Sequence, residues 1–454
     1  MSSIFNDLIK EHGKARVGTT DNPGLEKKWK EYDGDVSILT RKLPIGTPEH
    51  KSNNKLRNDY RSMIVDQGVT YFIGNPVSTS LKGEEPKGIA MLDKFQKTND
   101  VEDLDLGTAI YNAVCGYSGR LFYIDKSGEE RAMNLPPWEV IFVYDKTTDE
   151  LQYALIYYKM KIVTVGKDTV EITKVEWYDK NKVYYYIETG NPGSVPGTYF
   201  TLDKSEVNNP QPHGFTGVPL VEFLNNNSKK GDFDRVEDLI DGYDRIVSDS
   251  QNELEDLRNA YMVFKGLVPG DKEMAQAKLT GAFGSEDPDF DVSFLTKELT
   301  GTFHENHKKT LNDNIYRFSK RVDMNDEKFS GATQSGENRK WKMLALENDA
   351  VMKERKFTKA LRAQYKLLCS SWTKKNVTVN YLDIKYQFTR KLPTDLEYYA
   401  TIVTQLFGKV PTEILYSILP FIENPKDAVK MMEEELKGEI NLDSYNQQDE
   451  NQDQ

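Results

Sequence analysis

Apolar residues recur three or four positions apart in several stretches of the chain, and this spacing predicts helices with one buried face. One long stretch of this kind covers residues 231–262, where Ser228 and Asp232 offer helix start signals. About thirty helical residues would span ~45 Å at 1.5 Å per residue. We predict further helices over 54–69, 101–117, 303–322 and 337–374, and shorter ones that begin at Pro393, Pro411 and Pro425.

A second pattern occupies the region between Arg120 and Thr189, where short runs of Val, Ile, Tyr and Phe are separated by turn sequences. These runs predict an antiparallel meander, to which a hydrophobic segment at 220–224 returns. Residues 263–300 should form a small insert, with strand-like ends at 262–268 and 290–295 around a short helix. A further strand pair is predicted at 377–381 and 384–388. Helices and antiparallel strands together place the chain in the α+β class.

Composition sets the number of units and the class of protein. With 454 residues, the chain exceeds the size at which one hydrophobic core keeps growing, so we expect two or three structural units. Apolar residues make up 38 % of the chain, which is enough for packed cores and argues against wholesale disorder. Residues 1–49 mix short apolar stretches with Gly, Pro and charge and are expected to form a loosely held arm. Residues 441–454 are expected to form a disordered polar tail.

The cellular compartment is indicated by three further features. No stretch reaches the roughly 18 apolar residues of a membrane span, and the start lacks a hydrophobic region of signal-peptide length. A soluble protein with no membrane partner is therefore expected. The two cysteines, Cys115 and Cys369, suggest no disulfide framework and are expected to be core thiols in a reducing cytoplasm.

The two longest predicted helices carry opposite charge. Residues 232–258 contain ten acidic and three basic residues, whereas residues 339–375 contain eleven basic and three acidic ones. Such an acidic run can be an ordinary solvated face, can pair with a basic partner, or can keep polyanions from sticking. Duplex DNA carries one charge every ~1.7 Å, so an acidic wall beside it would let the DNA slide. The acids nominated for such a wall are Asp234, Glu237, Asp238, Asp241, Asp244, Asp249 and Glu253.

A loop rich in Gly, Ser and Thr separates the return helix at 303–322 from the basic helix. From this position its flexible backbone and basic flanks could touch a central object, although it could equally be a plain surface connection. The residues nominated for the contact are Lys328, Phe329, Ser330, Gly331, Ala332, Thr333, Gln334, Ser335, Gly336, Arg339 and Lys340.

The common catalytic motifs are missing from the sequence: it contains no phosphate-binding GxxxxGK[ST] loop, no GxGxxG, no HExxH, no GxSxG and no CxxC. His304 and His307 lie one helical turn apart, but spacing suggests no third ligand, so a surface or capping role is expected. A metal-dependent nuclease acting on DNA is the alternative, with Asp289 and residues 326–328 holding Mg²⁺. Charged triplets of this kind arise by chance in a chain with 29 % charged residues. We therefore expect no enzyme, no metal and no cofactor.

Three segments resemble portal proteins of tailed bacteriophages, of the type found in siphophages of Gram-positive hosts. The first, from Asn53 to Ser78, is similar to the helix-and-turn signature of that family and reads NNKLRNDYRSMIVDQGVTYFIGNPVS. The second, LPPWEVIFVYD at 135–145, resembles the strand that follows in the family. The third, SGENRKWKMLALENDAVMKERKFTKALRAQYKLL at 335–368, resembles its long helix. The resemblance extends over about 50–440.

The resemblance implies a portal fold, whose parts can be assigned segment by segment. A wing of antiparallel sheet and helices would cover 50–230, and the two stem helices would cover 231–262 and 303–324. A small α/β clip would lie between them at 263–302. The tunnel loop would occupy 325–338, the long wing helix 339–376 and a helical crown 377–440.

The resemblance also implies a function without catalysis. Identical subunits, probably twelve in number, would form a ring at one vertex of the capsid, through which double-stranded DNA is packaged and ejected. Implied partners are the major capsid and scaffolding proteins, the terminase large subunit and a head-tail adaptor. The protein would reside in the virion after assembly in the host bacterial cytoplasm.

Overall fold

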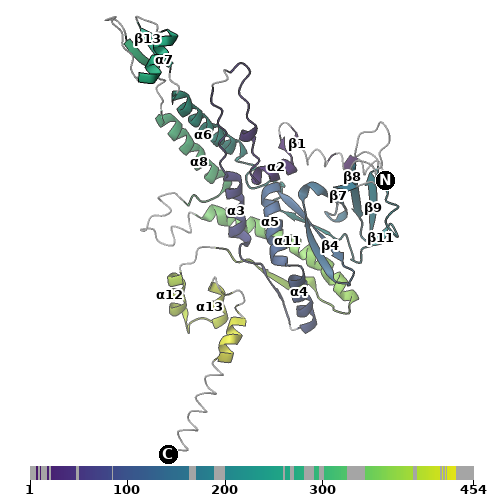
Figure 1. The fold of residues 1–454 in the computed structure, drawn as a ribbon. Coiled ribbons are helices and arrows are strands. Elements are labelled where there is room, and N and C mark those ends of the chain that lie inside the picture. Colours follow the sequence, from purple (N-terminus) through teal and green to yellow (C-terminus); the bar gives the residue numbers. More distant parts are fainter. Residues whose placement is uncertain are drawn as a thin grey trace, which may run out of the picture. The chain divides into compact units, whose positions relative to one another are not determined.

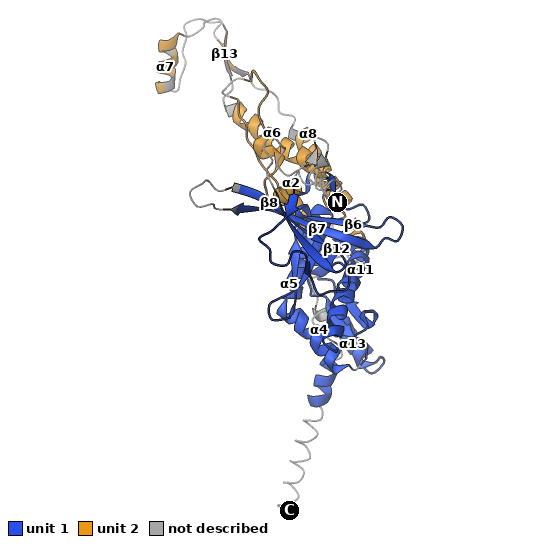
Figure 2. Cartoon of the chain, turned by 90° about the vertical axis from the view of Figure 1, so that its right-hand side faces the viewer, with its two compact units in different colours: residues 1–25, 66–231, 347–454 blue, residues 26–65, 232–346 orange. Residues whose placement is uncertain are grey.

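The computed structural model describes residues 7–8, 11, 18–19, 22–47, 51–83, 85–162, 170–188, 200–258, 261–265, 270–280, 291–295, 301–324, 343–391, 396–419, 422, 425 and 427–435. These residues fall into two compact units (Figure 2). Unit 1 comprises Met1–Leu25, Asp66–Gly231 and Glu347–Gln454, and unit 2 comprises Glu26–Val65 and Asp232–Leu346. Both helices and antiparallel strands are present, so the α+β class predicted from the sequence is confirmed (Figure 1).

Unit 1 contains two main sheets rather than the single meander predicted for 120–189. The smaller sheet has the order β12-β4-β5, and the larger one runs β10-β9-β8-β7-β6 with β11 also paired to β9. The meander is confirmed for β6 to β9, which pair antiparallel in chain order, and is wrong for the first two strands, which pair with each other and, through β4, with the strand at 220–224. The strands are β4 (Tyr117–Ile124), β5 (Glu130–Leu135), β6 (Val140–Tyr144), β7 (Leu151–Ile162), β8 (Val170–Tyr178), β9 (Lys182–Glu188), β10 (Phe200–Leu202), β11 (Gln211–Pro212) and β12 (Leu220–Leu224).

The larger sheet is built on side chains that alternate along its strands. Leu155 and Tyr157 of β7 point to the same face, as residues two apart in a strand must, and pack with Ile141 and Val175. All four side chains are buried. The apolar side chains whose alternate spacing predicted these strands therefore form the core beside the larger sheet.

The helices of unit 1 meet in an aromatic cluster. Phe357 of α11 (Leu344–Lys374) lies 5.0 Å, between ring centroids, from Phe223 of β12 and 5.8 Å from Phe72 of α3 (Tyr60–Ile73). Phe388 stacks on Phe72 at 5.5 Å. Offset and edge-to-face pairs of this kind stabilise a core beyond the area they bury. The long basic helix is thus fixed to the small sheet by its buried side.

Glycine and proline mark the ends of two helices in unit 1. The helix predicted at 101–117 is α5 (Val101–Cys115), which ends at Gly116, where φ is +89°. A Cβ there would lie 2.1 Å from the Lys229 carbonyl oxygen, so only glycine fits. Before it comes α4 (Pro86–Thr98), with its proline in the first turn. The remaining helices are α12 (Leu396–Leu406), α13 (Thr412–Ile418) and a helical stretch at 427–435.

The predicted pairing of a strand at 377–381 with a strand at 384–388 is wrong. β15 (Ile384–Gln387) pairs antiparallel with β3 (Ser78–Leu81), from the other end of the sequence. Tyr381–Asp383 form a short 3₁₀ turn, at whose start the Asn380 side chain accepts a hydrogen bond from the backbone of Leu382. Residues 377–380 form no strand: the N–H group of Val377 is bonded to the carbonyl oxygen of Trp372 at the end of α11 and is not available for a ladder.

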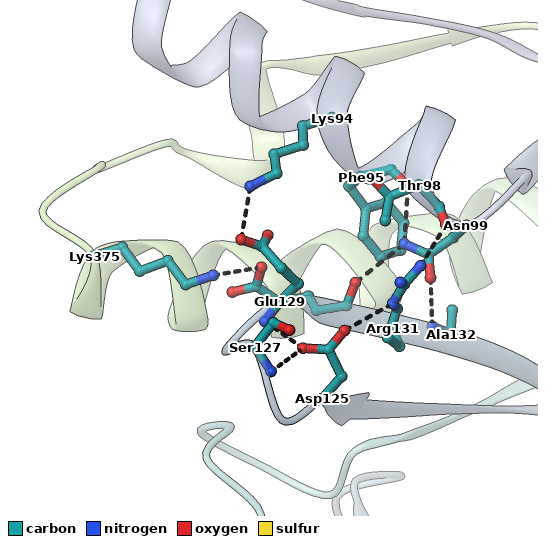
Figure 3. A network of polar contacts seen from close by, with 11 residues as sticks. Lys94, Phe95, Thr98, Asn99, Asp125, Ser127, Glu129, Arg131, Ala132 and Lys375 are labelled. Carbon is teal, nitrogen blue, oxygen red and sulfur yellow. Dashed lines mark hydrogen bonds and ion pairs between the residues drawn. The ribbon is translucent and has the colours of Figure 1, made fainter.

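The β4–β5 hairpin of unit 1 is held by polar contacts at its turn (Figure 3). Asp125 accepts backbone hydrogen bonds from Ser127 and Glu129, at 2.8 and 3.0 Å, and pairs with Arg131 at 3.1 Å. Lys94 of α4 reaches Glu129 at 2.7 Å. The turn hydrogen bonds lower the pKa of Asp125, because they favour its charged form.

Unit 2 contains an antiparallel helix pair with a small module between them. α6 (Glu237–Arg258) and α8 (Gly301–Ser319) lie side by side, and β13 (Tyr261–Lys265), α7 (Asp271–Thr280) and β14 (Asp291–Leu295) connect them (Figure 1). β13 pairs antiparallel with β14, which confirms the predicted insert of two strands around a short helix. The helix predicted over 231–262 is shorter than expected, because residues 232–236 form turns and β13 begins at Tyr261.

The N-terminal part of unit 2 is folded. α2 (Leu25–Tyr32) and the 3₁₀ turn Ser37–Thr40 place Val36 and Ile38 in buried positions, each 4 % exposed. The loosely held arm predicted for 1–49 is therefore wrong for residues 25–40. Two further short strands, β1 (Gly18–Thr19) and β2 (Asn22–Pro23), pair with each other in unit 1.

Candidate functional site

The acidic helix α6 carries most of the site residues that the sequence nominated and the structure describes. The loop residues nominated between 328 and 340 lie outside the described residues, as do Asp289 and residues 326–328 of the nuclease alternative. The site is therefore built from α6 and the segments of unit 2 that contact it.

Basic side chains from residues 28–61 neutralise acids of α6 and of the turn before it. Lys28 lies 2.7 Å from Asp234, and Arg41 lies 2.6 Å from Asp249. Arg61, which is 2 % exposed, lies 2.7 Å from Asp241. At the far end of the helix Lys51 lies 2.9 Å from Asp256, and this contact lowers the pKa of Asp256. The basic partner of the acidic helix is thus a segment that was predicted, in large part, to be a loosely held arm.

A ladder of hydrogen bonds fixes residues 52–58 along α6. The backbone N–H groups of every second residue of this extended segment donate to side chains at every fourth residue of the helix. Two extended residues advance ~6.6 Å and four helical residues ~6 Å, so the two repeats match. The donor and acceptor pairs are Ser52 to Asp256 (3.3 Å), Asn54 to Asn252 (2.6 Å), Leu56 to Ser248 (3.0 Å) and Asn58 to Asp244 (2.9 Å).

This ladder explains why α3 begins at Tyr60 and not at residue 54. Apolar spacing alone predicted a helix over 54–69, but the N–H groups of residues 54, 56 and 58 are already bonded to α6. A helix would leave the buried acceptors of α6 without partners, which is costly. Tertiary hydrogen bonds therefore override the local helical pattern.

Two carboxyls of α6 are buried enough to change their titration. Burial raises the pKa of Glu237 to about 7, and the charge of Glu31 adds to the shift while Arg61 opposes it. Burial also raises the pKa of Asp244, against the hydrogen bonds from Asn58. Asp238, by contrast, is exposed. The nominated acids thus differ in character, and only some present charge to solvent.

Replacing Glu237 with glutamine should stabilise the protein at high pH. In the folded state the carboxyl binds its proton more tightly than in the unfolded chain, so stability falls as pH rises from about 4.5 to about 7. Glutamine removes this loss. We expect no difference at pH 4.5 and a gain of about 1 kcal/mol at pH 8, a value reduced from the pKa shift because the side chain is only partly buried. Thermal unfolding at both pH values checks this, and an equal effect at both would contradict it.

The α8 side of the pair is anchored at both ends. Near its start, His304 lies 3.6 Å from Glu253 and 3.3 Å from the Ser250 hydroxyl of α6. After its end, Arg321 donates to the carbonyl oxygen of Ile64 at 2.7 Å and pairs with Asp232. His304 therefore has a structural partner, and no group of three potential metal ligands occurs in the described part of the chain.

Tyr60 joins the two helices in the middle. Its hydroxyl donates to Asn312 of α8 at 2.5 Å, and its ring meets the edge of Tyr243 of α6 at 5.1 Å between centroids. The first turn of α3 is thus fixed against both α6 and α8 by one side chain.

Sequence reasoning found the acids but missed what they hold. A signal was present: Asp244, Ser248, Asn252 and Asp256 are small polar residues four apart, which places them on one line along a helix. Lys28, Arg41, Lys51 and Arg61 supply the matching charges in the first 61 residues. Which basic residue pairs with which acid could not be predicted, because it depends on the register between two segments nearly two hundred positions apart.

Two other expectations can be compared with the structure. Cys115 and Cys369 are both buried, as expected for core thiols, and burial raises the pKa of Cys369 to about 12. Among the described helices, none combines the length and the apolar character needed to cross a membrane.

Comparison with known proteins identifies the family. The family described as "Phage portal protein, SPP1 Gp6-like" matches residues 14–442. The portal protein of Bacillus phage SPP1 is 25 % identical over 461 residues, covering 96 % of this chain and 86 % of that protein. The portal protein of Clostridium phage phiCD119 is 23 % identical over 421 residues, covering 88 % of this chain and 89 % of that protein. These matches lend no support to the nuclease alternative. The chain belongs to the SPP1 Gp6-like family of phage portal proteins.

Proposed function

We propose that identical copies of this chain form a ring of about twelve subunits at one capsid vertex, with double-stranded DNA passing through its centre. The observation that carries the proposal is the helix pair α6 and α8 with the β13–α7–β14 module at its end, in a member of a portal family. This arrangement is what a stem and a clip require. The clip would be residues 263–302, and the stem would be α6 and α8.

The other segments take the roles that the sequence suggested. The loop at 325–338 would face the DNA, residues 50–230 with α11 would form the wing, and residues 377–440 would form the crown. The clip would receive the terminase large subunit during packaging and a head-tail adaptor afterwards. The crown and wing side would meet capsid and scaffolding proteins. Assembly would take place in the bacterial cytoplasm, and the finished ring would remain in the virion without catalytic activity.

The acids of α6 divide between two tasks in this proposal. Asp234, just before α6, and Asp241 and Asp244 of α6 hold residues 28–61, and their charge is compensated or buried. The surface along which DNA slides would then rely on exposed carboxylates such as Asp238 rather than on the whole helix. This narrows the acidic wall to fewer side chains than the sequence nominated.

Shortening the loop from Gly331 to Gly336 tests the proposal. Because the loop would touch DNA and not the neighbouring subunit, its deletion should leave ring assembly unchanged and reduce packaged DNA by about tenfold or more. Packaging is measured as nuclease-protected DNA in assembled particles. A deletion of the same length in the Gly- and Pro-rich loop at 190–197 serves as the control. Normal packaging with the shortened loop would contradict the assignment.

A further inference from the structure

The outward side of α11 carries an apolar patch followed by a line of positive charge. Val351 and Met352 are 36 % and 52 % exposed. Arg355, Lys359, Arg362 and Lys366 follow at intervals of three or four residues, and all four are exposed. Lys359 has a salt bridge to Asp149, with both side chains largely exposed. We call these six residues of α11 the α11 stripe.

Exposure of this side contrasts with the rest of α11. Phe357, Leu361, Tyr365 and Leu368 are each 2 % exposed or less, so the helix is otherwise inside unit 1. The solvent-facing side of such a helix is normally polar, so the two exposed apolar residues there are unusual. The adjoining apolar and basic parts of the stripe together fit a protein partner with an acidic surface.

A second group of exposed residues in unit 1 is acidic. At the start of α5, Glu102 and Asp103 are exposed, and Leu106 one turn later is 38 % exposed. This group has the complementary composition, with two acids beside an apolar side chain. We call these three residues the α5 face.

The buried Arg120 fixes how the two surfaces are oriented. Its Nη1 atom lies 2.8 Å from Asp105 of α5 and donates to Gln364 of α11 at 2.9 Å, so the two helices flank one guanidinium group. At about 100° per residue, Asp103, Leu106 and Glu102 lie about 160°, 100° and 60° from Asp105 around α5, so the α5 face is turned away from Arg120 chiefly at Asp103. By the same count, the four basic residues of the stripe lie within about 40° of the side of α11 opposite Gln364.

A subunit with a basic side and an acidic side can associate head to tail. Such heterologous contacts close into rings when the rotation between neighbours permits, whereas a self-complementary patch gives a two-fold dimer. We propose that the α11 stripe of one subunit docks on the α5 face of the next copy of this chain. The proposal rests on the ring proposed above, and it assigns the contact that holds neighbouring subunits together in unit 1.

Nucleic acid is a less suitable occupant of the stripe. Phosphate contacts would use the four basic residues, but they would leave Val351 and Met352 exposed and give the α5 face no partner. A second copy accounts for the apolar part, the basic part and the acidic surface together. Opposite charges across such an interface steer encounter and exclude wrong partners.

Charge reversal of each surface provides the test. The double variant Arg362→Glu/Lys366→Glu should lose ring assembly by about tenfold or more, because like charges then face each other. Glu102→Lys/Asp103→Lys should lose it to a similar extent. A chain with all four substitutions should assemble again, and so should an equimolar mixture of the two double variants. Ring fraction is measured by native mass spectrometry, and circular dichroism confirms that the exposed substitutions leave the fold intact.

A control variant shows whether the effect belongs to these two surfaces or to any change of charge. Lys180→Glu/Lys182→Glu reverses two exposed lysines at the β8–β9 turn and should leave rings unchanged. Normal rings from either α11 or α5 double variant, or no recovery in the four-site chain, would overturn the interface. Normal rings with lost salt-dependent binding to duplex DNA would overturn it in favour of a nucleic-acid surface. A wild-type chain that stays monomeric would overturn the proposed ring itself.

Discussion

Replacing Arg120 with methionine is expected to lower the free energy of unfolding by about 3–5 kcal/mol. The side chain is fully buried and donates hydrogen bonds to Asn134, Thr108 and Gln364, at 3.1, 2.7 and 2.9 Å. Its removal leaves the Asp105 carboxyl, 4 % exposed, without a compensating charge. Burial already raises the pKa of Asp105, and Arg120 opposes this shift. Thermal unfolding at pH 8 measures the loss, because Asp105 must then ionise or take up a proton inside the core.

A matched control and a rescue make this result specific. Arg131→Met removes an arginine of the hairpin network in Figure 3, which is about one third exposed, and should cost less than about 1 kcal/mol. Asp105→Asn in the Arg120→Met background should recover part of the loss, since the uncompensated charge is gone. Equal effects of Arg120→Met and Arg131→Met would contradict the account of the buried pair.

Replacing Arg61 with methionine should also destabilise the protein strongly, and it should release residues 26–58 from α6. Arg61 lies 2.7 Å from Asp241 and 3.7 Å from Glu31, whose side chain is 1 % exposed. Without Arg61, the like charges of Glu31 and Glu237 lose the buried cation that opposes them, and the nearest remaining lysine is Lys27, 3.3 Å from Glu31 and about half exposed. We expect a loss of about 3–5 kcal/mol. Limited proteolysis should then cut between residues 40 and 58 at an increased rate, because the ladder to α6 opens.

An exposed neighbour supplies the control for Arg61. Arg57 is about half exposed and donates to the carbonyl oxygen of Gly34 at 2.8 Å, so Arg57→Met removes an arginine of the same segment with little desolvation. It should cost less than about 1 kcal/mol and leave the proteolysis pattern unchanged. Protection of residues 40–58 in Arg61→Met at the wild-type level would show that the ladder holds without the buried arginine.

The elements of the fold that could be predicted are those fixed by local pattern. The strand at 220–224 has the predicted bounds, and the two-strand insert with its short helix appears where alternation and helix-forming residues indicated it. Errors arose where partners are distant in sequence. β15 pairs with β3, some three hundred positions away, and no local property of residues 377–388 selects that partner.

In the candidate site, too, local features could be predicted and contacts with distant residues could not. The acidic character of residues 232–258 was visible, since charge is read directly from the sequence. The roles of individual acids were not, because burial and partners decide whether a carboxylate acts on solvent. Asp244 is 1 % exposed and accepts hydrogen bonds from Asn58, whereas Asp238 is exposed. Spacing turns Asp238 about 120° away from Asp244 around the helix, but it does not show which of the two sides is buried.

The ring is the central claim, and one measurement on the purified full-length chain tests it most directly. Native mass spectrometry combined with electron microscopy should give a closed ring of about twelve copies with an open centre. The ring should persist on dilution, as expected for subunits that share a large interface. A stable monomer at high protein concentration, with intact secondary structure, would contradict the proposal that this chain forms the DNA channel of a capsid vertex.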